Sequence, residues 1–173
     1  MLNALKQQLE VPLDEALAMA QGHHQAGNLA LAERTYRDIL RTVPDHFPTT
    51  QFLAGVLYQT GSYQEAKYFF ERAVEAAADD INCLNNFGGV LLQMKECEEA
   101  LVYFDKALDI DPEHVDVLNN KAFCLWLMKD YAGAEQLSRK VLKLDHQNII
   151  ALNGLAMALA RLYRYEEALD AWA

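Results

Sequence analysis

Four carboxamide side chains recur at intervals of 34 residues along the chain: Gln51, Asn85, Asn119 and Asn153. Each lies in a mostly apolar segment, such as LNNFGGVLL at residues 84–92. A carboxamide both donates and accepts hydrogen bonds, and burying one without a partner costs about 1–3 kcal/mol. The regular spacing therefore predicts a polar row that can bond the main chain of an extended peptide. The alternative is a solvated polar face with no special role.

The asparagines that follow directly, Asn86 and Asn120, favour a structural role, because buried amides are normally satisfied within the fold. If the row that contains Asn119 binds a partner, Asn119→Ala should weaken that binding and leave the melting temperature nearly unchanged.

A second group of candidate side chains consists of aromatic residues and a methionine. Helical periodicity places Tyr58, Phe123, Trp126 and Met157 on the same face as the carboxamides. Aromatic and methionine side chains often anchor a partner, so Phe123, Trp126 and Met157 are expected to form an apolar binding patch. The alternative is that they pack against the next helix.

Histidines and cysteines give no comparable signal. His23 and His24 point about 100° apart on a helix, whereas zinc needs three or four converging ligands. His46, His114 and His146 occupy equivalent loops, so repetition explains them. No Cys–His or Ser–His–Asp arrangement and no glycine-rich phosphate loop is evident. The sequence predicts no catalytic residue, no metal and no cofactor.

The helices expected to carry these residues follow the same period. Small residues recur 34 apart in two series: Ala32, Ala66, Ala100, Ala134 and Ala168; and Ala20, Ala54, Gly88, Ala122 and Ala156. A third series is aromatic, with Tyr36, Phe70, Phe104 and Trp172, and is broken by Ser138. Each repeat is predicted to hold two amphipathic helices of about 14 residues that approach closely at the small positions. Gly27 and Gly61 mark the turn between them in the first two repeats.

These series resemble the tetratricopeptide repeat, most completely at residues 81–114, which carry Leu84, Phe87, Gly88, Leu91, Ala100, Phe104, Ala107 and Pro112. The resemblance covers residues 13–173. It implies an all-α, right-handed superhelical solenoid of antiparallel helix pairs, with the first helix of each pair lining a concave groove. The implied repeats are 13–46, 47–80, 81–114, 115–148 and an incomplete 149–173, after a helical leader at 1–12.

Two finer resemblances concern function. Some members of the family hold a partner's carboxyl terminus with lysine at the fifth position of a repeat and asparagine at the ninth. No repeat of this sequence has lysine at its fifth position or asparagine at its ninth. The phrase AGNLALAERTYRDILRTVPDH resembles the opening repeat of bacterial proteins that join such an arm to an O-linked N-acetylglucosamine transferase-like enzyme. That resemblance implies a substrate-recruiting arm of a larger transferase as an alternative function.

Composition excludes several classes of partner. The net charge of −10 disfavours nucleic acids and anionic membranes, which bind positive surfaces. The sequence has no apolar segment of the roughly 18 residues that indicate a spanning helix and no secretory signal, and its three cysteines are expected to be reduced thiols of a cytoplasmic protein.

The sequence therefore predicts a non-catalytic scaffold that holds a protein or peptide in its groove. Because solenoids usually end in a polar cap and none is visible, we also expect either excision from a longer protein or self-association through the last repeat.

Overall fold

The computed structural model describes residues 11–171, and the secondary structure of this part is entirely helical. The prediction of an all-α fold built from helix pairs is confirmed. The first helices of the pairs are α2 (Leu13–Gln25), α4 (Phe47–Gln59), α6 (Ile81–Gln93), α8 (Val115–Leu127) and α10 (Ile149–Arg161). The second helices are α3 (Leu29–Thr42), α5 (Tyr63–Ala76), α7 (Cys97–Ile110), α9 (Tyr131–Leu144) and α11 (Tyr165–Asp170).

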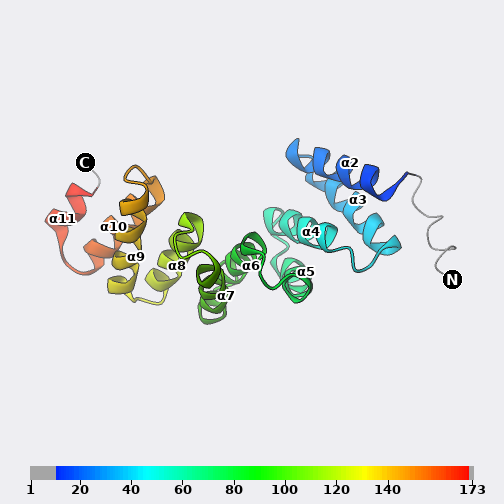
Figure 1. Ribbon diagram of the computed structural model, residues 1–173. Helices are drawn as coiled ribbons and strands as arrows, with labels where there is room; N and C mark the ends of the chain where they lie inside the picture. Colours follow the sequence, from blue (N-terminus) through cyan, green and yellow to red (C-terminus); the bar gives the residue numbers. More distant parts are fainter. Residues whose placement is uncertain (1–10, 172–173) are drawn as a thin grey trace. The chain divides into compact units, whose positions relative to one another are not determined.

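The helices belong to two compact units, which are described separately (Figure 1). The N-terminal unit, residues 1–78, contains α2 to α5, and the C-terminal unit, residues 79–173, contains α6 to α11. Most of the leader expected at residues 1–12 lies outside the described residues, as does Trp172.

All five helix pairs of the described part are closed by the same turn. The N–H two residues beyond the helix cap bonds a carbonyl five residues back, as in Asn28 N to His23 O at 2.8 Å and Glu96 N to Leu91 O at 2.9 Å. This 6→1 bond needs one residue with a left-handed backbone. Gly27 and Gly61 supply it with φ of 76° and 80°, as predicted. In the other three pairs Lys95, Lys129 and Tyr163 adopt φ of 64°, 68° and 63°, so the turn persists without glycine.

The two helices of a pair meet where the sequence places its small residues. The alanines of both small series are buried within the described part. The closest approach is in the third repeat, where Gly88 on α6 faces the fully buried ring of Phe104 on α7. A Cβ added at Gly88 would lie 2.4 Å from Phe104 Cε1, so only glycine fits beside that ring.

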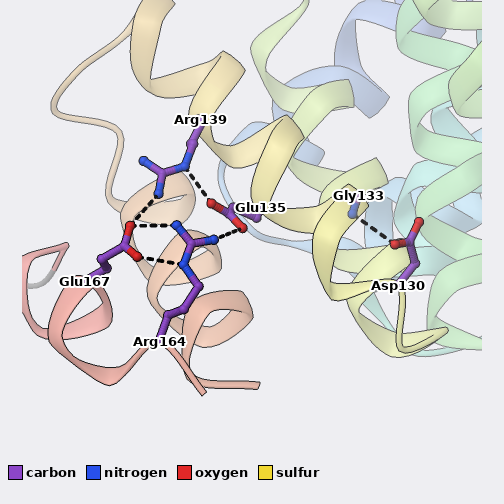
Figure 2. A network of polar contacts seen from close by, with 6 residues as sticks. All are labelled: Asp130, Gly133, Glu135, Arg139, Arg164 and Glu167. Carbon is purple, nitrogen blue, oxygen red and sulfur yellow. Dashed lines mark hydrogen bonds and ion pairs between the residues drawn. The ribbon is translucent and has the colours of Figure 1, made fainter. Parts of the chain in front are cut away.

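A network of charged side chains holds the last described helix (Figure 2). Arg164 bonds Glu135 on α9 at 2.7 Å and Glu167 on α11 at 2.6 Å, and Arg139 bonds the same two carboxylates at 2.8 and 3.3 Å. The hydrogen bond from Arg164 holds the pKa of Glu167 below its usual value. Single exposed ion pairs contribute little, but these four side chains form a network that links α11 to α9. Leu169 on α11 is 65% exposed.

Candidate partner-binding site

In the C-terminal unit the first helices pack side by side, because α6 contacts α8 and α8 contacts α10. The face of these helices that carries Asn85, Asn119 and Asn153 is called the inner face. Three of the four predicted carboxamides lie on these helices: Asn85 on α6, Asn119 on α8 and Asn153 on α10. The fourth, Gln51, lies on α4 of the N-terminal unit together with Tyr58, and both are half-buried. The structure therefore groups three carboxamides in one unit.

Two of these three carboxamides also serve the fold. Asn120 Nδ2 donates to Asn85 Oδ1 at 3.0 Å, which links α8 to α6. Asn119 is 6% exposed, and its Nδ2 donates to Asn148 Oδ1 at 3.2 Å. Asn148 Oδ1 also accepts from Ala151 N at 3.0 Å and so caps α10. Asn119 therefore helps to hold the start of α10.

Part of the row stays available to a partner. Asn153 is exposed, and its side chain makes no hydrogen bond to another residue of the described range. Asn85 Nδ2 and Asn119 Oδ1 likewise have no bond within residues 11–171. One donor and one acceptor of the paired asparagines, and both groups of Asn153, can therefore bond a peptide main chain.

A concave pocket of about 220 Å³ opens between α8, α9 and α10. Its lining includes five of the residues singled out from the sequence: Asn119, Phe123, Trp126, Asn153 and Met157. The other lining residues are Ala122, Ala134, Ser138, Ile150 and Gly154. No side chain in this lining is charged, and apart from two asparagines and a serine the surface is apolar. Such a surface suits an apolar side chain held between hydrogen-bonding groups.

Aromatic rings form one wall of the pocket. Phe123 and Trp126 stack at 6.3 Å between ring centroids with planes 10° apart, and Tyr131 meets the Trp126 ring edge-on at 6.2 Å. The guanidinium carbon of Arg161 lies 5.5 Å from the centroid of Trp126, in a cation–π contact. The buried Trp126 Nε1 has no acceptor within the described part of the chain.

The pocket exists because the aromatic series is broken at Ser138. In the first repeat the ring at this position, Tyr36, is fully buried and stacks on Phe52 of the next helix pair at 5.9 Å. The corresponding residues in the fourth and fifth repeats are Ser138 and Gly154, and a Cβ added at Gly154 would lie 3.0 Å from Ser138 Oγ. Two small residues thus replace two rings, and the vacated space opens to the inner face.

The three cysteines are buried free thiols. Cys83 and Cys124 are fully buried, and burial raises the pKa of each thiol to about 12. Cys124 Sγ donates to the Cys97 carbonyl at 3.2 Å. A thiol with so high a pKa is a poor nucleophile at neutral pH. Among residues 11–171, no group of His, Cys, Asp and Glu side chains is arranged to hold a metal ion.

The family models that match the chain all describe the tetratricopeptide repeat (TPR). They match residues 46–113, 91–137 and 149–172. The chain belongs to the tetratricopeptide repeat family. The helix pairs of both units are thus TPR pairs, and the all-α solenoid predicted from the sequence is confirmed. No helix of the described part combines the length and apolar character needed to cross a membrane.

Solved structures of other TPR proteins share this fold. MamA residues 41 to the end from Desulfovibrio magneticus RS-1 is 16% identical with a TM-score of 0.86, covering 92% of this chain and 90% of that one. PilF of Pseudomonas aeruginosa is 25% identical with a TM-score of 0.80, and the match covers 92% of this chain and 73% of PilF. YrrB, described as a TPR protein with an unusual peptide-binding site, is 20% identical with a TM-score of 0.76, covering 90% and 80%. A search of curated proteins finds no significant match.

Proposed function

We propose that the inner face of the C-terminal unit binds a segment of a partner protein and that the chain catalyses no reaction. The observation that carries this proposal is that one pocket is lined by Asn119, Phe123, Trp126, Asn153 and Met157, the residues expected from the sequence to bind a partner. The peptide-binding description of the structurally similar YrrB supports the same class of function.

The surface around the pocket supports an apolar contact. Phe123 is 45% exposed and Ile150 is 63% exposed, and both line the pocket. Large apolar side chains that gather around a concavity frequently mark an interaction site. Asn119 and Asn153 lie in the same lining and would bond the main chain of the segment whose side chain enters the pocket.

Met157→Glu is expected to weaken partner binding by roughly 30-fold or more, because it places a charge among apolar lining residues. The probe is a displayed random-peptide library selected on the full chain, followed by calorimetric titration of the selected peptides. Val102→Glu is the matched control, since Val102 is a half-exposed residue of α7 that does not line the pocket. Equal affinities of the two variants for every selected peptide would contradict the proposal.

Asn119→Ala is expected to weaken the binding of the same peptides and also to lower the free energy of unfolding by about 1 kcal/mol. The sequence alone predicts no change in stability. The structure predicts a loss, because Asn119→Ala removes the bond from Asn119 Nδ2 to Asn148, the cap of α10. Asn153→Ala is the control, because Asn153 is exposed and should affect affinity alone. The two effects are separated by urea denaturation and peptide titration. If Asn119→Ala destabilises the fold but binds peptide normally, Asn119 is purely structural.

Two alternatives from the sequence, a transferase arm and self-association through the last repeat, stay predictions. The pocket favours neither.

A further inference from the structure

We propose that the pocket receives an aromatic side chain of the partner, of the size of phenylalanine, from a segment that carries a carboxylate beside it. This inference rests on the proposed function and specifies its ligand. It follows from the chain's own repeats, which show what normally fills this space.

The ring positions of the first three repeats define the shape of the vacant site. Tyr36, Phe70 and Phe104 are all fully buried between helices. Phe104 lies directly against the small residue at Gly88, and Ala122 is the equivalent small residue in the fourth repeat. Ala122 and Ser138 both line the pocket. The space beside Ala122 is therefore where the fold places a ring in its other repeats, and in the fourth repeat that ring is missing.

The size and the walls of the pocket agree with this occupant. An apolar protein cavity of about 150 Å³ binds benzene, and this pocket measures about 220 Å³. Phe123 and Trp126 both line the pocket, so an inserted ring would contact aromatic side chains, and aromatic pairs are favourable beyond the area they bury. Met157 adds a polarisable sulfur to the same lining, and sulfur–aromatic contacts are also favourable.

Charge determines the second part of the ligand. The pocket lining holds no acidic side chain, although the chain as a whole carries a net charge of −10. Arg161 stands over Trp126 and is exposed, and within the described residues it has no carboxylate partner. A carboxylate next to the inserted ring would complement this guanidinium. An acidic, aromatic segment therefore suits this face better than a basic one.

The test uses small probes on the uniformly ¹⁵N-labelled full chain. N-acetyl-L-phenylalanine is expected to shift the amide signals of Ala122, Gly154 and Met157 with a dissociation constant in the millimolar range. N-acetyl-L-alanine should leave them unchanged. The N-methylamide of N-acetyl-L-phenylalanine, which lacks the carboxylate, should bind about two- to fivefold more weakly. Arg161→Gln should remove that difference, whereas Lys143→Gln, on an exposed part of α9, should preserve it.

Ser138→Phe restores the missing ring from inside and should abolish the shifts without lowering the melting temperature. Gln136→Phe adds a ring at an exposed position of the same helix and should leave probe binding intact. If Ser138→Phe fails to fold, Ser138→Leu is the second variant. It fills part of the same space and should weaken the binding of N-acetyl-L-phenylalanine at least severalfold. Unchanged probe binding in a folded Ser138→Phe or Ser138→Leu variant overturns the inference, as does the absence of shifts in the wild-type chain.

The selected peptides distinguish this inference from the proposed function. If peptides without an aromatic residue bind, and Met157→Glu weakens them while Ser138→Phe does not, the aromatic inference fails and the proposed function stands. If no selected peptide responds to Met157→Glu, both fail.

Discussion

Phe104→Ala is expected to lower the free energy of unfolding by about 3–5 kcal/mol, the usual cost of removing a buried phenylalanine ring. Phe104 is fully buried, and its ring packs against Gly88. Its removal leaves a cavity between α6 and α7 in addition to losing the apolar contact. Urea denaturation followed by circular dichroism measures the change.

Ser138→Ala is the matched control, because Ser138 occupies the same repeat position but carries no ring. It should change the free energy of unfolding by less than about 1 kcal/mol. Similar losses for the two variants would mean that the buried ring of Phe104 adds no more stability than the serine does, which would contradict the packing described for the third repeat. Phe104→Leu, which keeps part of the apolar volume, should fall between them.

Gly88→Ala is expected to lower the free energy of unfolding by about 1–3 kcal/mol, the range found for overpacked cores. The added Cβ would lie 2.4 Å from Phe104 Cε1, and a fully buried ring has little room to retreat. Thermal and urea denaturation provide the measurement.

Gly22→Ala gives the opposite sign and serves as the control. Gly22 is an exposed residue within α2, and an added Cβ meets nothing within 4 Å. Alanine there should raise stability by about 0.5–1 kcal/mol, because glycine is a poor helix former. Combining Gly88→Ala with Phe104→Leu should recover part of the loss caused by the first change. The steric explanation is wrong if Gly88→Ala stabilises the chain as Gly22→Ala does.

The helix pairs could be predicted from the sequence because their determinants repeat. Small and aromatic residues spaced 34 apart specify which faces meet, and each repeat confirms the pattern of the others. The turns were predictable only where glycine marks them, at Gly27 and Gly61. At Lys95, Lys129 and Tyr163 the hairpin imposes a left-handed backbone that the residue type does not indicate.

The candidate site was partly predictable for the same reason. Asn119, Phe123, Trp126, Asn153 and Met157 share a helical face by periodicity alone, and the structure places all five around one pocket. The pocket itself forms where two residues without rings, Ser138 and Gly154, face each other. They lie on different helices, so only the packed structure shows that they meet. The break in the aromatic series at Ser138 was the available signal, but its consequence needed the three-dimensional fold.

A bond within the fold was predicted for Asn120 and is present, but the partners of the asparagines were not predictable. Asn120 bonds Asn85 and Asn119 bonds Asn148, over separations of 35 and 29 residues. These pairs depend on side-chain orientation between neighbouring helices, which spacing does not determine. The result is a row that both supports the fold and keeps free groups for a partner.

Chemical-shift mapping of the full chain with one peptide selected from the library shows directly whether the pocket between α8, α9 and α10 binds the partner. We expect the largest amide shifts at Ala122, Phe123, Gly154 and Met157, and little change on α2 to α5. A saturable peptide that shifts other signals and leaves these four unchanged would contradict binding at this pocket.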